Sequence, residues 1–571
     1  MEPTTGKSGG GNRPSAMKRY GPLIVIVAIV AVVAIVVALT SGGGDDGDSA
    51  TSSTTSSSGN GPGPSGKAPW PTFTEGDTST DWGDHCDEKT GKVAIPWNYA
   101  AQCTKAQTTN PGATATGVTG DSIKIVVYQG DPAKNPLQAA TVKGAGADVS
   151  PATAREVYQG YIDGFAKYYN LYGRKIDLVF FPGTGGPMDP VTAKADADAI
   201  ADMKPFAVLS GPNQTPAWSS EITARKVMCL GQCSLAVPQQ TVSDNSPYLM
   251  SGGPTPEQAG LLTAKFVTEQ LKGKKAVYGG SAVQDKTRVF GVTHYDTIDG
   301  QQKEAFATLK GALTDGGVKI AADLPFQLDL ARGQENARTM IAKLKEAGVT
   351  TVIYTGDPLT PKNLTQEATA QNYFPEWVIG SNVLVDIALF GRTYDQEQWQ
   401  HAFGLALTGA RVNQDANESY NLYKWFTGVK PQNNTYGIIL SDMAQLVTGL
   451  HLAGPNLSPD TFQAAMWAGE VRGGTPIDPR TSWGHHDLWP TTDWGGSDDA
   501  GLIWWNPKAN GEDEVGVVGD GLYEYTADGK RYTLDEMPSQ DPGLFDESSS
   551  VTIFTTVPKQ YQPPSYPSTA K

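Results

Sequence analysis

Two hydrophobic periods alternate along the chain from residue 121 onward. The run IKIVVYQ at 123–129 is typical of a buried strand. The segment after Ser150 places four apolar residues at helical spacing on one face, namely Val157, Tyr161, Phe165 and Tyr168. Comparable apolar runs predict further strands at 176–181, 206–210, 227–230, 288–295, 318–324, 350–355 and 376–381. This alternation of strands and helices predicts parallel sheets joined by right-handed crossovers.

Helix starts carry a repeated dipeptide in which proline follows Ser, Thr or Asp. A side-chain oxygen at the first position accepts a hydrogen bond from the first turn of the helix. Proline at the second position removes no intrahelical hydrogen bond, because the N–H there would have no acceptor in the helix. The signal predicts helices that begin at Ser150-Pro151, Asp189-Pro190, Thr215-Pro216, Thr255-Pro256, Thr360-Pro361 and Ser458-Pro459. Periodicity also predicts helices over 256–271 and 436–453.

The strand and helix units fall into two series, which the segment 245–256 separates. We therefore predict two α/β lobes at 121–250 and 251–385, with 386–545 completing both lobes and 546–571 forming a C-terminal tail. Ligands of open α/β sheets bind at the carboxyl ends of the strands. Two such lobes are expected to share a cleft and to close around a small molecule by a hinge motion.

The N-terminal region predicts a membrane anchor. Residues 23–39 contain no polar side chain, and 21–40 matches the roughly 20 residues that span a bilayer. Lysine and arginine precede this segment, which predicts a cytoplasmic tail at 1–20 and a single-pass cell-membrane protein with an extracellular C-terminal body. A cleaved signal peptide is the alternative, but its apolar core is usually shorter. The Gly-, Ser- and Asp-rich residues 41–67 predict a disordered linker.

Charge and cysteine content narrow the class of protein. The 571 residues include 60 acidic and 44 basic side chains, and the net charge of −16 disfavours nucleic acid as a partner. Outside the membrane, the four cysteines favour two disulfides. The most economical pairs are Cys86 with Cys103, in an N-terminal extension at 68–120, and Cys229 with Cys233. Other pairings and a zinc site are alternatives, although the spacings do not resemble paired zinc knuckles.

Catalytic and metal-binding motifs find little support. The sequence contains no G-x-S-x-G elbow, no G-x4-G-K-[ST] loop and no H-E-x-x-H helix. The segment 482–505 holds candidate metal ligands at His485, His486, Asp487, Asp498 and Asp499. Their spacing matches no metal motif and favours a structural loop, and the tryptophans beside them suit either a stacked sugar or strand packing. We therefore expect no enzyme activity, no cofactor and no metal, with an extracellular hydrolase as the alternative.

Several local phrases carry a resemblance to a known family. They are DSIKIVVYQGDP (121–132), YNLYGRKIDLVFF (169–181), KPFAVLSGPNQTP (204–216), ARKVMCLGQ (224–232), PYLMSGGPTPEQ (247–258) and VTTVIYTGDPLTP (349–361). In this order they resemble the type I periplasmic binding fold of branched-chain amino acid and amide ABC-transporter solute-binding proteins, over about 120–535. The segment 86–103 resembles an N-terminal extension of actinobacterial-type relatives. The resemblance implies an α/β fold with two lobes, each a parallel sheet flanked by helices.

The resemblance also implies where a ligand is held. In the family, a hydroxyl and backbone N–H groups at a helix N-terminus bind the ligand, which corresponds here to Ser210, Gly211, Asn213 and Gln214. The next loop supplies Ser234, and the second lobe supplies Tyr295, Asp357, Ser381 and Asn382. Asp357 either meets a ligand ammonium group or caps the helix at 360. A clear set of aromatic clamps is missing, and the loop at 131–149 is long, which puts an ordinary branched-chain amino acid ligand in doubt.

The function that the resemblance implies is capture of a small polar solute. A membrane-tethered extracellular binding protein would close its two lobes around an amino acid, an amide or a related molecule. Its partners would be the permease and ATPase subunits of an ABC importer. The alternative is a sensory ectodomain of the same fold, which reports the solute through a partner protein.

Overall fold

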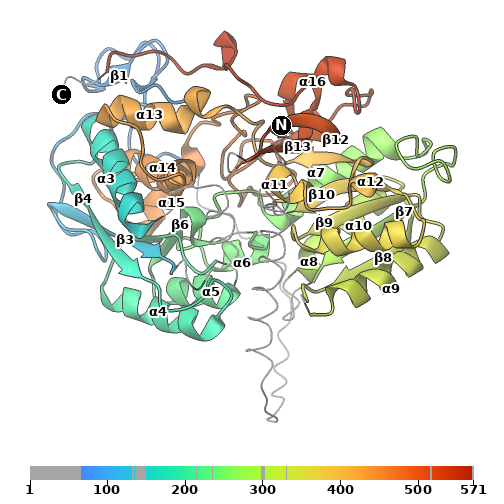
Figure 1. Cartoon of the computed structure of the whole chain (residues 1–571). Coiled ribbons are helices and arrows are strands. Elements are labelled where there is room, and N and C mark those ends of the chain that lie inside the picture. The colour runs from blue at the N-terminus through green and yellow to red at the C-terminus, as the bar shows by residue number, and fades with distance from the viewer. Residues whose placement is uncertain are drawn as a thin grey trace, which may run out of the picture.

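The computed structural model describes residues 66–131, 134, 150–213, 215–234, 236–296, 302–329, 331–382, 384–514 and 517–568. Two lobes lie side by side, each built on a sheet with helices against it (Figure 1). The predicted cytoplasmic tail, the membrane segment at 21–40 and most of the linker at 41–67 lie outside these ranges. Within them, no helix has both the length and the apolar character needed to cross a bilayer.

The first lobe contains a four-stranded sheet in the order β4-β3-β5-β6, and every pairing is parallel. Its strands are β3 (Ser122–Gln129), β4 (Lys175–Pro182), β5 (Ala207–Leu209) and β6 (Met228–Leu230). Its helices are α3 (Pro151–Tyr168), α4 (Pro190–Asp202), α5 (Pro216–Ala224) and α6 (Gln239–Asp244). In β3, Ile125 and Val127 face one apolar core and Val126 faces another. This burial on both faces explains the continuous apolar run of the central strand.

The second lobe has a larger, mixed sheet. Five parallel strands lie in the order β8-β7-β9-β10-β11: β7 (Phe290–Tyr295), β8 (Ile320–Phe326), β9 (Thr351–Gly356), β10 (Glu376–Asn382) and β11 (Ala402–Ala406). Helices α7 (Pro256–Phe266), α8 (Lys303–Asp315), α9 (Gly333–Glu346) and α10 (Thr360–Ala370) accompany them, and α7 continues as a π-helix over Val267–Leu271.

The predicted parallel sheet of the second lobe is confirmed for these five strands, and antiparallel strands that the sequence did not predict extend it. Strands β12 (Ala500–Glu512) and β13 (Val518–Tyr525) form an antiparallel hairpin that joins the sheet beside β11. The short strands β14 (Arg531–Tyr532) and β15 (Ser550–Val551) pair with this hairpin. A two-strand hairpin needs no crossover helix, so a late segment of the chain can extend the sheet in this way.

The chain returns to the first lobe before it forms that hairpin. Helices α13 (Glu418–Thr427), α14 (Tyr436–Ala453) and α15 (Pro459–Ala468) lie with α3 (Figure 1), and their apolar faces enter the core of the first sheet. The predicted helix at 436–453 is confirmed at both ends. Shorter helices are α11 (Ala388–Gly391), α12 (Gln396–Trp399) and α16 (Thr526–Gly529).

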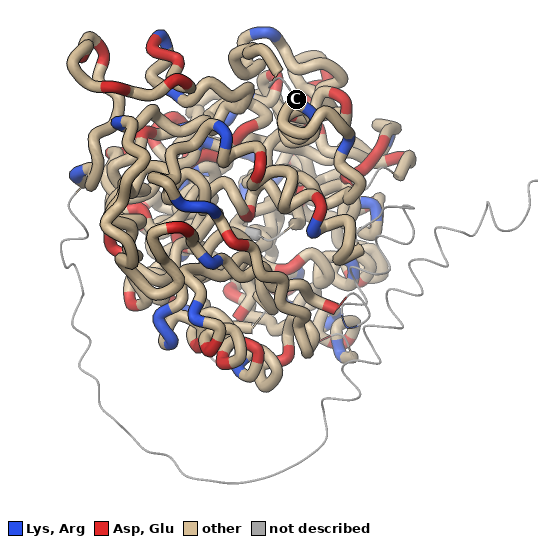
Figure 2. Tube along the Cα trace, turned by 90° about the vertical axis from the view of Figure 1, so that its left-hand side faces the viewer, with Lys and Arg blue, Asp and Glu red and all other residues tan. Residues whose placement is uncertain are grey.

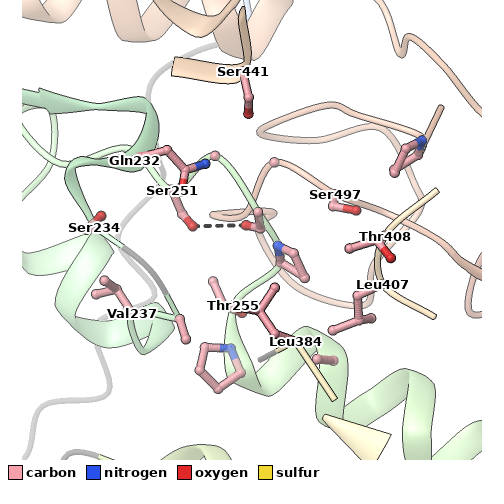
Figure 3. Close-up of a pocket in the computed structure, with 18 of the residues that line it drawn as sticks. Gln232, Ser234, Val237, Ser251, Thr255, Leu384, Leu407, Thr408, Ser441 and Ser497 are labelled. Carbon is pink, nitrogen blue, oxygen red and sulfur yellow. Dashed lines mark hydrogen bonds between the residues drawn. The ribbon is translucent and has the colours of Figure 1, made fainter. Parts of the chain in front are cut away.

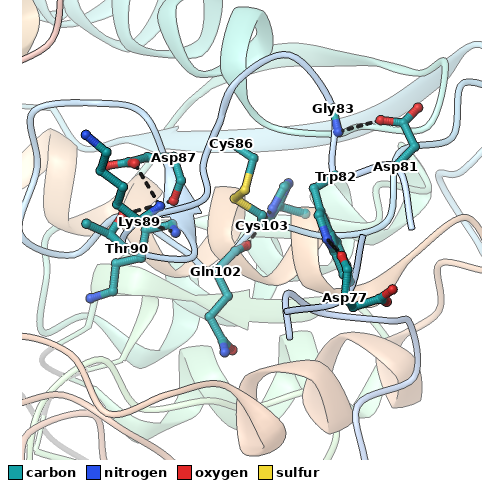
Figure 4. The surroundings of a disulfide bond; sticks show 12 residues. Asp77, Asp81, Trp82, Gly83, Cys86, Asp87, Lys89, Thr90, Gln102 and Cys103 are labelled. Atoms are coloured by element: carbon teal, nitrogen blue, oxygen red, sulfur yellow. Dashed lines mark hydrogen bonds between the residues drawn. A yellow bond between two sulfur atoms is a disulfide. The ribbon is translucent and has the colours of Figure 1, made fainter. Parts of the chain in front are cut away.

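The N-terminal extension packs onto the first lobe and carries one of the two disulfides. Cys86 and Cys103 are bonded, and they bring β1 (Cys86–Asp87) and β2 (Lys92–Val93) close to the strand-like segment at 102–104 (Figure 4). Trp97 then inserts against Phe165 of α3, with ring centroids 5.4 Å apart. The second bond joins Cys229 and Cys233, so both predicted pairings are confirmed.

Most of the predicted helix caps are confirmed. The side chains of five residues accept a hydrogen bond from the first turn of their helices: Ser150, Asp189, Thr215, Thr255 and Ser458. Thr360 is not a cap, because it is already the first residue of α10. The Asp357 carboxylate satisfies that helix end instead, accepting from the N–H groups of Leu359 and Thr360 at 2.8 and 2.9 Å.

Two aspartates of the His-, Asp- and Trp-rich segment at 482–505 hold it in the fold. Asp498 accepts hydrogen bonds from Ser482 Oγ at 2.7 Å and from Trp489 Nε1 at 2.9 Å. Asp499 forms a buried ion pair with Arg531. Among the described residues, no cluster of three or more His, Cys, Asp or Glu side chains is arranged to hold a metal ion. Figure 2 shows acidic and basic positions interspersed along the trace.

Candidate functional site

A cavity of about 1040 Å³ opens between the two lobes. In both sheets the first strand lies beside the second and third, so the strand order reverses there and leaves a crevice at the carboxyl ends. Residues that follow β5, β6, β7 and β9 line the cavity, together with the crossing segments at 251–256, 407–409 and 496–497. The cavity is therefore a property of the two-lobed topology.

The structure brings five of the nine sequence-predicted residues to the cavity. These are Asn213 and Ser234 from the first lobe and Tyr295, Asp357 and Ser381 from the second. Gln214 lies outside the described residues, as does the side chain of Asn382. The remaining two, Ser210 and Gly211, do not line the cavity.

The turn after β5 explains why Ser210 and Gly211 are excluded. Ser210 has a φ of 60°, which reverses the chain directly after the strand. Gly211 lies against Trp218, so close that an added Cβ would stand 2.1 Å from the indole Nε1. In the segment after β5, Asn213 is therefore the first residue to line the cavity. Its Nδ2 donates to the carbonyl of Gln232 at 2.8 Å. That bond ties two of the loops lining the cavity together.

Asp357 lines the cavity, but its carboxylate is occupied. Its Oδ1 accepts the two N–H groups of α10 named above, and its Oδ2 accepts from Thr360 Oγ1 at 2.8 Å. Burial raises the pKa of this carboxyl. The capping interpretation of Asp357 therefore accounts for its hydrogen bonds.

Helix α14 anchors the loop at 231–234, although the two are far apart in sequence. The N–H of Gly231 donates to Gln445 Oε1 at 2.9 Å, and the N–H of Gln232 donates to Asp442 Oδ1 at 2.5 Å. Tyr158 of α3 donates to the other oxygen of Asp442 at 2.6 Å. Sequence reasoning identified the helix but not these two side chains, because the contacts join residues 210 and 214 positions apart.

The contribution of the buried Asp442 to the stability of the fold is expected to depend on pH. Burial raises its pKa from 3.8 to about 6. A raised carboxyl pKa means that its contribution to stability is full below about pH 4 and is lost as the pH rises through about 6. Asp442→Asn keeps an oxygen acceptor for the Gln232 N–H and cannot ionise.

We expect the free energy of unfolding of Asp442→Asn to gain on that of the wild type between pH 4 and pH 7. The gain should be on the order of 3 kcal/mol if no other group responds. Urea denaturation at each pH measures it. Two parallel stability curves would contradict the raised pKa.

Four buried polar atoms that border the cavity have no hydrogen-bond partner among the residues that the structure describes. They are Ser234 Oγ, His294 Nδ1, Gln445 Nε2 and Ser497 Oγ. The residues Ser234 and Gln445 are 4% exposed, and Ser497 is 6% exposed. Figure 3 shows Ser441, Ser497 and Gln232 reaching toward one space from different segments. Buried polar groups are normally paired, so these atoms indicate where a ligand or water completes the site.

His294 stands at the end of β7, on the second-lobe side of the cavity. Its ring stacks on Phe306, and its Nε2 lies 3.0 Å from Asp323 Oδ1. Burial is the largest influence on this ring and lowers its pKa. A neutral imidazole held in this way presents Nδ1 as a single hydrogen-bonding atom.

Comparison with known proteins yields matches only among solved structures. No protein-family profile matches the chain, and neither does any curated protein. A leucine-, isoleucine-, valine-, threonine- and alanine-binding protein from Brucella ovis has 14% identity and a TM-score of 0.48, over 76% of this chain and 100% of that one.

Two further structures show a similar level of likeness. A branched-chain amino acid ABC transporter protein from Silicibacter pomeroyi, itself described as putative, has 12% identity and a TM-score of 0.48, over 74% of this chain and 100% of that one. A fatty acid ABC transporter substrate-binding protein from Thermomonospora curvata has 14% identity and a TM-score of 0.45, over 72% and 95%. The chain is similar in structure to these three proteins, at 12–14% identity.

Proposed function

We propose that this protein binds a small polar solute between its two lobes and delivers it to an ABC importer. The observation that carries the proposal is the cavity itself, which both sheets line at the carboxyl ends of their strands. Unpartnered polar atoms from both lobes border it. A solute that bonds to Ser234 on one side and His294 on the other would favour the closed arrangement of the lobes.

The site is suited to binding without a chemical step. Its unpartnered groups are hydroxyl, amide and imidazole atoms, which exchange hydrogen bonds with a solute. We further propose that residues 21–40 tether the two lobes to the outer face of the cell membrane and that the transporter's own subunits supply the energy. Protease added to intact cells should then remove the lobes, and protection of the lobes would contradict the orientation.

A thermal-shift screen of the full-length protein tests solute binding. The screen should contain amino acids, amides, urea, small carboxylic acids and neutral sugars. A solute that binds only the folded state raises the melting temperature, by mass action. If no solute in the screen shifts the melting temperature, the proposed function fails.

Ser234→Ala separates a ligand contact from a structural one. Its hydroxyl has no partner within the described part of the chain, so the variant should melt at or slightly above the wild-type temperature. The same variant should bind an identified solute about 3- to 10-fold more weakly by calorimetry, because it lacks one hydrogen bond.

Ser251→Ala is the matched control. Ser251 Oγ already donates to the carbonyl of Gly253 at 2.9 Å, so its loss should lower the stability of the ligand-free protein. Unchanged affinity in Ser234→Ala would remove Ser234 from the proposed site.

A further inference from the structure

The charged side chains that border the cavity are committed to the protein. Asp386 Oδ2 accepts from the N–H groups of Leu407 and Thr408 at 2.9 and 3.2 Å, and also from the Thr408 hydroxyl. Asp357 is occupied at the start of α10, as described above. Both carboxylates therefore have local donors and are poorly placed to serve as counter-charges for a ligand.

The remaining charged groups lie where the extension meets the crossing segments. Asn98 donates its N–H to Glu418 and its Nδ2 to Asp478, the latter at 2.7 Å. Arg472 is the only Lys or Arg among the described lining residues, and its Nη1 donates to the carbonyl of Tyr99 and to the hydroxyl of Thr448. Each of these groups thus has hydrogen bonds within the fold, and those of Arg472 are to neutral oxygen atoms.

The groups left over are neutral. Ser234 Oγ and Ser497 Oγ can each donate and accept, Gln445 Nε2 donates, and His294 offers Nδ1. The same space is also bordered by the hydroxyl-bearing residues Ser251, Thr255, Thr408 and Ser441, which Figure 3 labels together with Ser234 and Ser497. Val237, Leu384 and Leu407 add apolar surface to its wall.

From this distribution we infer that the solute is uncharged and carries several hydroxyl groups, as sugars and polyols do. This inference rests on the proposed function, because it assigns a ligand class to the same cavity. A ligand ammonium or carboxylate would lose its hydration in the cleft, where each charged side chain is already hydrogen-bonded within the fold, and that desolvation is costly. A hydroxyl needs only a donor or an acceptor, which the unpartnered serines supply, and the C–H faces of a sugar match the apolar wall.

Neutral and charged forms of one sugar test whether the cavity prefers an uncharged solute. Glucose, myo-inositol, ribose, xylose and trehalose form the neutral panel, with glucuronate as an anionic and glucosamine as a cationic counterpart of glucose. We expect at least one neutral member to raise the melting temperature of the full-length protein. The charged counterpart of a hexose that binds should bind at least 10-fold more weakly.

The variant Ser497→Ala tests the effect of one hydroxyl on affinity without a change in the stability of the fold. The Ser497 hydroxyl has no partner among the described side chains and backbone groups, so the ligand-free melting temperature should stay the same while affinity for the neutral solute falls several-fold. Binding of only charged solutes, such as amino acids or carboxylates, would overturn the inference and leave the proposed function standing. Loss of that binding in Arg472→Met would then identify an anion site. If no solute of any class binds, both proposals fail.

Discussion

Replacing Arg288 by methionine is expected to destabilise the second lobe by about 3–5 kcal/mol. Arg288 Nε and Nη2 donate to the two carboxylate oxygens of Glu376 at 2.7 and 2.8 Å, and the two side chains are 2% and 0% exposed. Glu376 also accepts from Thr351 Oγ1 at 2.6 Å. Without the guanidinium, a buried carboxylate loses its counter-charge, so the penalty is that of an uncompensated charge rather than of one hydrogen bond.

The Arg288→Met substitution should affect the cavity as well as the stability of the fold. Glu376 begins β10, the strand whose other end places Ser381 at the cavity. Urea denaturation measures the loss, which is a large part of the roughly 5–15 kcal/mol that stabilise a domain. Lys275→Ala is the control, because Lys275 and Asp285 form a pair that is 61% and 85% exposed. That variant should cost less than about 1 kcal/mol, and equal losses in both variants would contradict the role of the buried pair.

Replacing Gly231 by alanine should disrupt the loop at 231–234 and with it solute binding. Gly231 has a φ of +60°, which costs an L-residue about 1–2 kcal/mol. A Cβ there would also stand 2.7 Å from the Cα and the carbonyl oxygen of Asp442, so the loop or α14 must move. We expect a loss of stability beyond the conformational cost alone and at least a 10-fold loss of affinity, since Gln232 and Ser234 follow directly.

Gly76→Ala provides the matched control for that variant. Gly76 has a φ of +81°, but no atom lies within 4 Å of an added Cβ. It therefore reports the conformational cost without the clash. Gly231→Ala and Gly76→Ala with the same melting temperature and the same affinity would show that the close approach to α14 is unimportant.

Much of the fold follows from local patterns. The parallel strands of both sheets coincide with apolar runs in the sequence. Proline after a capping residue marks the starts of several helices. The hairpin of β12 and β13 was missed because Pro507 and Asn510 interrupt its sequence like turn residues. The structure accommodates them at a register shift between Asn506 and Asn510, so pairing continues across a signal that usually ends a strand.

The candidate site is less accessible to sequence reasoning. The rule that ligands meet the carboxyl ends of strands directs attention to loops such as those with Asn213 and Tyr295, which line the cavity. It does not reveal the direction of the turn at Ser210, which keeps that hydroxyl away from the cavity. Nor does it find Gln445 or Ser497, because these belong to segments that return from far along the chain and no local spacing records that contact.

Amide hydrogen exchange with candidate solutes tests most directly whether the cavity between the lobes is the binding site. The full-length protein would be exchanged with and without each solute of the screen. A solute bound between the lobes is expected to slow exchange in loops of both lobes at once, at 231–234 in the first lobe and 355–357 in the second. Protection confined to one lobe, or no protection with any solute, would contradict the claim that the two lobes bind a solute between them.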